Sequence, residues 1–365
     1  MSFEKVGFIG LGLIGGSIAR TIKKKYSDTT LIATARHADT IQEAHDFGTI
    51  ENDTLLPLSD FADCDYIFLC TPVQQNLIYL KELKSVINPS CIITDVGSVK
   101  SDIHKAVTAL DMEANFIGGH PMCGSEKTGF FNATEYLLEN AYYIITPTAK
   151  TTPAQLEEFH ALVKSLGSVP MILDYEKHDF ATAAISHLPH IIASSLVNLV
   201  SDLDDEQETM RTIAAGGFKD ITRIASSSPV MWQNICLSNQ EQILKLTDCY
   251  IHALQNIRSS VADAKSDDII SFFQSAKDYR DSITTPVRGS LQKNYSVYCD
   301  LVDEAGAIAT LATIMASHNI SIKNIGILHN REYEDGVLQI EFYEEDALEK
   351  AVKLMEDNHY VVHRR

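Results

Sequence analysis

Three glycines near the N-terminus have the spacing of a loop that binds phosphate. Gly10, Gly12 and Gly15 follow the apolar run of residues 6–10 and open a helical pattern. In a strand–turn–helix context, this GxGxxG spacing binds the pyrophosphate of a dinucleotide. Glycine permits the tight turn and the close approach, and the helix N-terminus offers free N–H groups. We therefore expect the loop to bind NAD or NADP through five residues: Gly10, Gly12, Leu13, Ile14 and Gly15.

The end of the second strand-like run leaves the choice of cofactor open. NAD-binding folds usually place an acidic residue there, which binds the ribose 2′-hydroxyl group. This chain has Ala35 in that place and Arg36 beside it. An arginine there could accept the 2′-phosphate of NADP, so the sequence leaves the choice between NAD and NADP open. Thr71 and Pro72, after the third strand-like run, complete the predicted cofactor contacts.

Ser98 and His120 each follow a strand-like run in a glycine-containing segment. Ser98 lies in DVGSVK and His120 in GGHPMCGSE. Ligands bind beyond the carboxyl ends of the strands in such sheets, so both side chains could meet a substrate or the nicotinamide. Histidine titrates near neutrality and can accept a proton or a hydrogen bond. Ser98 is also suited to cap the N-terminus of a helix that starts near Val99.

Two later segments add imidazole and cationic side chains. His187 and His190, in SHLPH, are three residues apart, which would place both rings on one helical face. No third cluster of ligands accompanies them, so we expect no metal site. Lys219 and Arg223, in GGFKDITRIA, are four residues apart and would form a small cationic face that can bind a carboxylate.

The elements that must position these residues change character along the chain. Residues 1 to about 170 alternate β-rich runs with helical patterns, which predicts βαβ units, a parallel sheet and a Rossmann-type domain. Residues 179–281 have helical apolar spacing and little strand signal. The β-rich runs are 6–10, 30–35, 66–70, 91–95, 115–118 and 142–146.

The pattern changes again after the helical block. Residues 284–290 contain proline, glycine and serine and are typical of a linker. The βαββαβ order that follows predicts a ferredoxin-like domain. The expected organisation is a Rossmann domain, a helical domain that binds substrate and dimerises, a linker and a ferredoxin-like domain, at residues 1–175, 176–283, 284–294 and 295–365.

Composition and charge exclude several classes of protein. The net charge of −19 argues against nucleic-acid binding, since no basic stripe could neutralise phosphates. No run approaches the roughly 18 consecutive apolar residues of a membrane span, and no secretory signal is expected. The seven cysteines lack a CxxC pair and suit a reducing compartment. We therefore expect a cytoplasmic protein that neither enters a membrane nor binds nucleic acid.

The motifs GLGLIGGS, DVGSVK, GGHPMCGSE, SHLPH and GGFKDITRIA, in this order, resemble the prephenate dehydrogenase family. The final seventy residues resemble an ACT domain, a module that senses amino acids. The resemblance implies that prephenate loses a hydride to the nicotinamide and CO₂ from its ring, which yields 4-hydroxyphenylpyruvate for tyrosine biosynthesis.

The resemblance also implies roles for individual side chains. Neutral His120 accepts the hydrogen bond of the ring hydroxyl group, and Ser98 orients His120 or that hydroxyl. Arg223 holds the ring carboxylate, and His190 lies beside the pyruvyl side chain. The resemblance gives supporting or gating roles to Glu126, His187, Lys219 and Asp220.

Three alternatives to prephenate oxidation differ in how well they fit the sequence. Arogenate, the amino-acid analogue of prephenate, would undergo the same chemistry, and the sequence leaves this choice open. A different Rossmann reductase would not explain HPMCGSE and SHLPH together. A non-catalytic tyrosine or nucleotide sensor would predict the loss of His120 or Arg223, yet both are present. The helical block favours a homodimer, and the ACT resemblance implies feedback inhibition by L-tyrosine.

Overall fold

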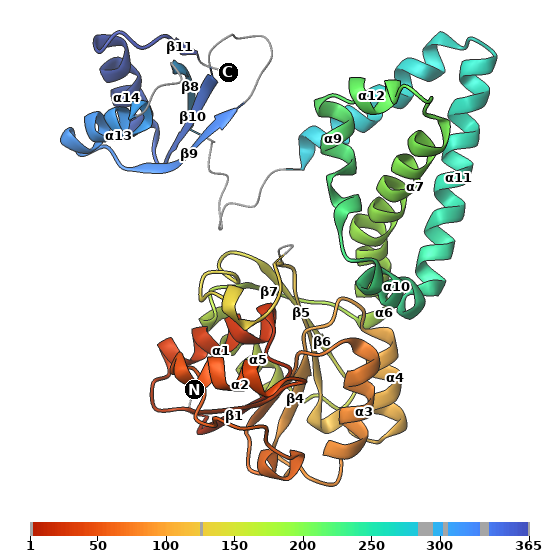
Figure 1. The fold of residues 1–365 in the computed structure, drawn as a ribbon, viewed down its shortest axis with the longest axis vertical. Coiled ribbons are helices and arrows are strands. Elements are labelled where there is room, and N and C mark those ends of the chain that lie inside the picture. The colour runs from red at the N-terminus through yellow and green to blue at the C-terminus, as the bar shows by residue number, and fades with distance from the viewer. Residues whose placement is uncertain (1–2, 125–126, 284–294, 302–305, 329–335, 364–365) are drawn as a thin grey trace. The chain divides into compact units, whose positions relative to one another are not determined.

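The computed structural model (Figure 1) describes residues 3–124, 127–283, 295–301, 306–328 and 336–363. The chain divides into two compact units, residues 1–269 and 270–365. Glu126 and the stretch 284–290, which the sequence predicts to be a linker, lie outside the described residues.

The first unit begins with a four-stranded parallel sheet of Rossmann type, in the spatial order β2-β1-β3-β4. Helices α1 and α2 cover one face, and α3 and α4 cover the other (Figure 1). Because both faces are covered, the strands are apolar almost throughout. The strands are β1 (Lys5–Ile9), β2 (Thr30–Thr34), β3 (Tyr66–Leu69) and β4 (Ile92–Asp95). The helices are α1 (Leu13–Lys25), α2 (Ala38–Asp46), α3 (Val73–Leu83) and α4 (Ser101–Ala109).

A second sheet of three strands corrects one expectation. It contains β5 (Ile117–Pro121), β6 (Tyr142–Pro147) and β7 (Val169–Ile172). The prediction that all strands up to residue 146 are parallel is wrong, because β5 and β6 pair antiparallel. A parallel pair needs a long crossover, usually a helix, whereas the described residues between β5 and β6 include only the short 3-10 helix η3 (Phe130–Asn132). By contrast, α5 (Pro153–Ser165) makes such a crossover between parallel β6 and β7.

Helices form the rest of the first unit, as the apolar spacing predicts. A π-helical turn, η4, joins α6 to α7 without a break in the chain's helical path. These elements are α6 (Tyr175–Thr182), η4 (Ala183–His187), α7 (Leu188–Leu203), α8 (Thr209–Ile213), α9 (Gly216–Thr222), the 3-10 helix η5 (Arg223–Ser226), α10 (Pro229–Ser238) and α11 (Gln240–Ala262). Helix α12 (Ser266–Ser282) begins in this unit and crosses the division between the two units.

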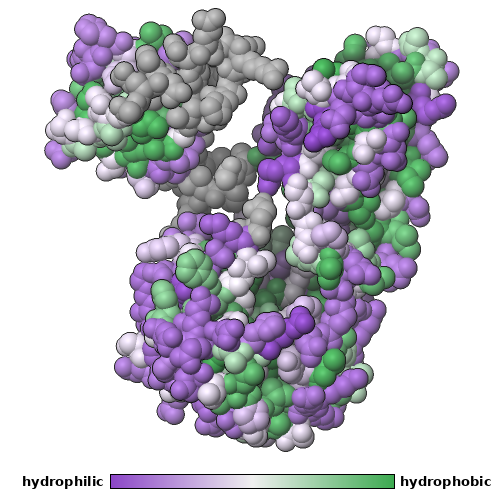
Figure 2. Space-filling view, viewed as in Figure 1, coloured by the Kyte–Doolittle hydropathy of each residue, from purple (hydrophilic) through white to green (hydrophobic). Residues whose placement is uncertain are grey.

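The continuous helix over Tyr175–Leu203 departs from the prediction that no segment resembles a membrane span. By length and composition it could cross a membrane, with a mean hydropathy of 1.4, and 17% of its apolar window is buried. Exposed apolar side chains on α7 and α11 enlarge this surface. They include Leu199, Leu203, Leu244, Ile251, Leu254 and Val261. Figure 2 shows green atoms among purple ones over the helical part of the first unit. An exposed apolar surface of this kind marks an interaction site.

The second unit contains a four-stranded antiparallel sheet with two helices. The strand order β11-β8-β10-β9 is that of a ferredoxin-like βαββαβ fold, as predicted. Its core consists of apolar side chains from the sheet and from both helices. The elements are β8 (Tyr295–Leu301), α13 (Ala307–Ser317), β9 (Ile322–Leu328), β10 (Gly336–Phe342), α14 (Glu345–Asp357) and β11 (Val362–His363).

Candidate active site

The glycine loop between β1 and α1 has the geometry of a dinucleotide site. Gly10 has φ of +92°, and a Cβ atom there would lie 2.6 Å from the Cγ2 atom of Thr71. A Cβ atom on Gly15 would lie 2.7 Å from the carbonyl oxygen of Gly10. Around Gly12, in contrast, no described atom lies within 4 Å of such a Cβ. The loop therefore has free space beside the N-terminus of α1, where a pyrophosphate group fits.

The other predicted cofactor residues lie at the same edge of the sheet. Leu13 and Ile14 open α1, directly after the loop. Thr71 and Pro72 follow β3, and Pro72 precedes the first residue of α3. Arg36 lies two residues beyond the end of β2, and its side chain is exposed. The carboxyl ends of three neighbouring strands thus present the residues predicted to contact the nucleotide.

A cleft of about 330 Å³ lies next to this edge. Thr71, Pro72 and Ser98 line one wall, and α10 forms the opposite wall. The amide nitrogen of Gln74 donates a hydrogen bond of 3.0 Å to the hydroxyl oxygen of Ser238, which connects the two walls. Ser98 is not the N-cap of the next helix, since Lys100 has that position. The structure therefore places Ser98 with the predicted cofactor residues.

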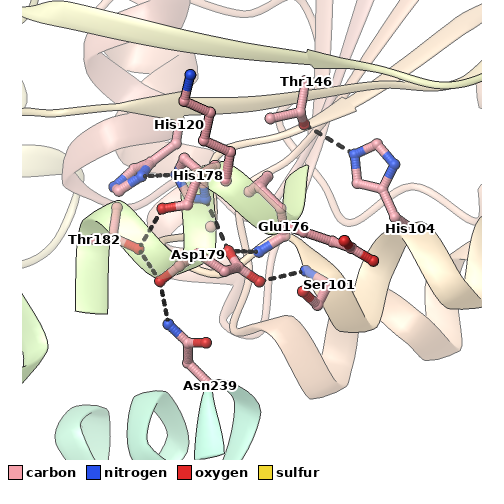
Figure 3. Close-up of polar contacts among 12 residues, drawn as sticks. Ser101, His104, His120, Thr146, Glu176, His178, Asp179, Thr182 and Asn239 are labelled. Atoms are coloured by element: carbon pink, nitrogen blue, oxygen red, sulfur yellow. Dashed lines mark hydrogen bonds and ion pairs between the residues drawn. The ribbon is translucent and has the colours of Figure 1, made fainter. Parts of the chain in front are cut away.

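His120 is the first member of a chain of hydrogen bonds (Figure 3). The Nδ1 atom of His120, on β5, lies 2.8 Å from the Nε2 atom of His178, on α6. The Nδ1 atom of His178 lies 2.8 Å from the Oδ1 atom of Asp179. Both His178 and Asp179 are buried, whereas the ring of His120 is partly exposed. The arrangement is a His–His–Asp relay whose outer imidazole belongs to the partly buried His120.

The surroundings of His120 keep its imidazole neutral at neutral pH. Burial lowers the pKa of His120 well below its ordinary value of 6.5, and nearby His178, Lys100 and His187 lower it further. A neutral imidazole has one nitrogen that donates and one that accepts a hydrogen bond. His120 can therefore act as an acceptor toward a substrate hydroxyl group.

Asp179 also connects α6 to the N-terminus of α4. Its carboxylate accepts hydrogen bonds from the backbone N–H groups of Lys100, at 2.8 Å, and Ser101, at 2.7 Å. These are N–H groups that the first turn of a helix leaves without an intrahelical partner. Burial would raise the pKa of Asp179, but hydrogen bonds from His178, Ser101 and Lys100 hold it below the ordinary value of 3.8. Asp179 is thus an ionised carboxylate at the junction of the two helices.

The buried side chain of Lys100 fixes the backbone just before His120. Its ammonium group forms an ion pair with the carboxylate of Asp95 and donates a hydrogen bond of 2.7 Å to the carbonyl oxygen of Gly119. The backbone N–H of Gly119 in turn donates to the carboxylate of Asp95, at 3.3 Å. Burial lowers the pKa of Lys100, while Asp95 opposes this shift. The ion pair therefore connects the end of β4 to β5 at the residue that precedes His120.

His187 and His190 share one neighbour, Trp232. The ring of His190 stacks on the indole with 3.8 Å between centroids, and that of His187 meets it edge-on at 6.0 Å. The Nδ1 atom of His190 donates to the carbonyl oxygen of Ser186, at 2.8 Å. The Nδ1 atom of His187 accepts from the amide of Asn239, at 3.1 Å, and burial lowers the pKa of His187 to about 4. Among the described residues, no cluster could hold a metal ion.

The predicted cationic residues lie at the surface. Lys219 belongs to α9, and its side chain is exposed. Arg223 begins η5, which packs against α7, the helix that carries His190. Its side chain is also exposed. The structure therefore brings Arg223 close to the histidine-bearing helix in the fold, and both Lys219 and Arg223 are exposed.

Comparison with known proteins identifies the family. Residues 18–172 match the model of the prephenate dehydrogenase nucleotide-binding domain, and residues 174–275 match that of the prephenate dehydrogenase dimerization domain. The prephenate dehydrogenase of Bacillus subtilis is 38% identical over 95% of this chain and 94% of its own length. The prephenate dehydrogenase of Lactococcus lactis is 34% identical over 97% and 98%. The chain belongs to the prephenate dehydrogenase family.

Solved structures of the prephenate dehydrogenase family share the fold of the first unit. The prephenate dehydrogenase of Aquifex aeolicus, in complex with hydroxyphenyl propionate and NAD⁺, has a TM-score of 0.73 at 28% identity. It covers 78% of this chain and 99% of its own. Synechocystis arogenate dehydrogenase has a TM-score of 0.70 at 31% identity and covers 77% and 100%. These likenesses confirm the predicted Rossmann-type and helical domains.

Sequence reasoning within the prephenate dehydrogenase motifs missed several residues of the site. His178 and Asp179 lie outside every motif, although an adjacent His–Asp pair just after the helix N-cap Asp174 is a usable signal. Trp232 is the only tryptophan in the chain, which was a second signal. Asn239 gave no such signal, because nothing in the sequence connects it to His187.

Proposed function

We propose that the chain catalyses the oxidative decarboxylation of prephenate to 4-hydroxyphenylpyruvate, with hydride transfer to a nicotinamide dinucleotide, in tyrosine biosynthesis. One observation carries the proposal: a neutral His120, joined to buried His178 and Asp179, lies on β5 of the domain that carries the glycine loop. The family match and the two relatives at 38% and 34% identity support the same reaction.

In this reaction His120 acts on the ring hydroxyl group of prephenate. When bound, the nicotinamide would supply the acceptor for the hydride on the carbon that bears the hydroxyl, and CO₂ would leave from the opposite ring carbon. His120 accepts the hydrogen bond of the hydroxyl while its oxygen gains carbonyl character. The product is a phenol, so the hydroxyl proton is part of the product and the enzyme needs no net proton sink. A neutral His120 suits this task, since an imidazolium could only donate.

The remaining predicted residues bind and position the two ligands. Ser98 lines the cleft beside Thr71 and Pro72 and orients either the hydroxyl group or the nicotinamide. Arg223 binds the ring carboxylate, and the exposed Lys219 adds positive charge on the same short segment. His190 and His187, around Trp232, lie beside the pyruvyl side chain. Glu126 is proposed as a gating group, and it lies outside the described residues.

Arogenate is the second candidate substrate, and one comparison favours it. Synechocystis arogenate dehydrogenase is 31% identical to this chain over 77% of its length.

Steady-state assays with prephenate and arogenate, each with NAD and NADP, test the proposal. We expect a kcat/KM for prephenate in the range of about 10⁴–10⁸ M⁻¹s⁻¹ with one of the cofactors. Absence of turnover with both substrates would contradict the proposed reaction.

We further propose that the chain is a cytoplasmic homodimer. The matched family domain is described as a dimerization domain. The exposed apolar side chains of α7 and α11 give this interface a physical basis, because their burial between two copies removes apolar surface from water. The helix over Tyr175–Leu203 then packs against protein rather than lipid. His187 and His190, with their hydrogen bonds and the shared indole, suit a protein interior at this point of the helix.

The last part of the proposal assigns residues 295–365 to an ACT-like regulatory domain that binds L-tyrosine. The observed βαββαβ fold supports this assignment. Gly306, with φ of +95°, precedes α13, and no described atom lies within 4 Å of a Cβ atom placed there. A glycine in this position allows an amino-acid ligand to approach the helix N-terminus, whose N–H groups suit its carboxylate.

A further inference from the structure

The relay from Asp179 to His120 has a defined direction. Asp179 accepts three N–H donors: the backbone groups of Lys100 and Ser101 and the ring of His178. An ionised carboxylate can only accept hydrogen bonds. The Nδ1 atom of His178 must therefore carry a hydrogen atom and donate it to Asp179.

The direction of the next bond of the relay follows for a neutral His178. A neutral His178 that donates from Nδ1 has a lone pair on Nε2. That lone pair faces the Nδ1 atom of His120 at 2.8 Å, so with His178 neutral the Nδ1 atom of His120 is the donor. The Nε2 atom of His120 is then left with a lone pair on the partly exposed end of the relay. A protonated His178 would reverse this result and leave Nε2 of His120 as a donor.

We propose that Asp179 is a positioning residue that, through His178, fixes His120 in the tautomer whose Nε2 atom accepts the hydroxyl group of the substrate. The proposal deepens the proposed function and rests on it for the identity of that hydroxyl group. The tautomer itself is a property of the protein without substrate. In a Ser–His–Asp triad, a carboxylate orients a histidine in the same way and stabilises the charge that forms on it.

The position of Asp179 also allows its negative charge to stabilise positive charge on His120. Positive charge develops on His120 as the hydroxyl proton shifts toward it, and the neighbouring ammonium group of Lys100 opposes that charge. Lys100 is partly compensated by its ion pair with Asp95. Asp179 lies at the far end of the relay, where hydrogen bonds transmit polarisation in a low-dielectric interior. Its carboxylate therefore favours charge on His120 when the substrate hydroxyl is bound.

The first test reads the tautomer directly, in the wild-type protein with NAD⁺ and no substrate. Nitrogen-15 NMR of histidine-labelled protein, with His120 and His178 assigned from the spectra of His120→Asn and His178→Gln, reports which ring nitrogens carry hydrogen. We expect the Nδ1 atom of His120 to carry hydrogen and its Nε2 atom to carry none. Hydrogen on Nε2 of His120 would overturn the proposal. This result does not depend on which substrate is turned over, so it stays informative even if the proposed reaction is wrong.

The second test changes the carboxylate. An amide in Asp179→Asn cannot accept at both former oxygen positions, and the matching change in a Ser–His–Asp triad lowers kcat about 10⁴-fold through the wrong tautomer. We expect kcat to fall by roughly 10³–10⁴-fold, while the Kd for NAD⁺ changes by less than about threefold. In His178→Gln, the amide oxygen can still accept from Nδ1 of His120, so the loss should be smaller than in Asp179→Asn.

Asp174→Asn is the matched control. Asp174 caps the N-terminus of the same helix with hydrogen bonds to the N–H groups of Glu176 and Lys177, outside the relay. We expect it to keep the wild-type kcat and the wild-type tautomer of His120. A kcat within tenfold of wild type in Asp179→Asn would refute the positioning role. A loss in Asp179→Asn that comes with an equal loss of NAD⁺ binding would show a structural role instead, and would also refute it.

Discussion

At the scale of single residues, His120 combines a strongly lowered pKa with a partly exposed ring. We expect His120→Asn to lower kcat far more than it raises KM. The proposed hydrogen bond to the hydroxyl group would strengthen as the reaction proceeds, and its loss should cost roughly 10²–10⁴-fold in rate. Steady-state kinetics with prephenate measure the changes in kcat and in KM separately. Turnover like that of wild type would remove His120 from the mechanism.

Two other buried histidines should make stability depend on pH. Burial lowers the pKa of His104 and of His187 to about 4 in the folded protein, against 6.5 as the ordinary value. Between pH 6.5 and 4 the unfolded chain binds protons that the folded protein does not, so stability falls as pH falls through this window. Each histidine contributes up to about 3 kcal/mol, which is fully present above pH 6.5.

His104→Gln tests this dependence. The ring of His104 bonds the hydroxyl group of Thr146 at 2.9 Å, and a glutamine amide can replace that bond without titrating. We expect melting temperatures measured from pH 7.5 to 4.5 to fall less steeply in the variant than in wild type. His160→Gln serves as a control, since His160, on α5, is less buried than His104. Parallel curves for wild type and His104→Gln would disprove the assignment.

Arg36 provides a prediction about cofactor choice. Its exposed side chain follows β2, at the place where an acid would favour NAD. If Arg36 binds a 2′-phosphate, Arg36→Ala should raise the KM for NADP by roughly tenfold or more and leave the KM for NAD nearly unchanged, because only NADP carries that group. Steady-state kinetics of wild type and Arg36→Ala with NAD and with NADP measure these two KM values. Equal effects on NAD and NADP would show that Arg36 does not select between them.

At the scale of elements, local patterns predicted the four parallel strands and the glycine loop. Apolar runs and glycine spacing are properties of neighbouring residues, so they are visible in the sequence. The antiparallel pairing of β5 with β6 was not predicted, because strand direction depends on the path of the loop between the two strands. The bond from His120 to His178 joins residues 58 positions apart. No local pattern encodes such a contact, which explains why His178 and Asp179 were missed.

The apolar surface of α7 and α11 leads to a prediction about assembly. Leu199 and Leu203, both on α7, are 54% and 62% exposed. Replacing both with glutamate should halve the mass in solution, because charged groups at the centre of an apolar interface must be desolvated. Light scattering after size exclusion measures the mass. Ile78→Glu, on exposed α3 of the nucleotide-binding region, is the control and should leave the mass unchanged. A double variant that keeps the wild-type mass would place the interface elsewhere.

At the scale of the whole molecule, the ferredoxin-like unit leads to a prediction about regulation. We expect L-tyrosine to inhibit the intact enzyme and to inhibit a chain truncated after Ser290 much less. Inhibition requires tyrosine to bind the less active arrangement more tightly, with a coupling free energy of typically about 1–3 kcal/mol. Titration of tyrosine into both forms measures the difference. Equal inhibition would mean that tyrosine competes as a product analogue at the active site.

The relay has a further consequence, since it crosses the boundary between the two matched family domains. His120 lies within residues 18–172, whereas His178 and Asp179 lie within residues 174–275. A nucleotide-binding domain severed at this boundary would keep the glycine loop and the histidine but lose the groups that orient the ring. A chimera that joins the two domains of different relatives at residue 173 would therefore have to keep the angle between the domains as well as the fold of each domain. The hydrogen bonds of the relay thus couple the orientation of the His120 ring to the relative position of the two domains.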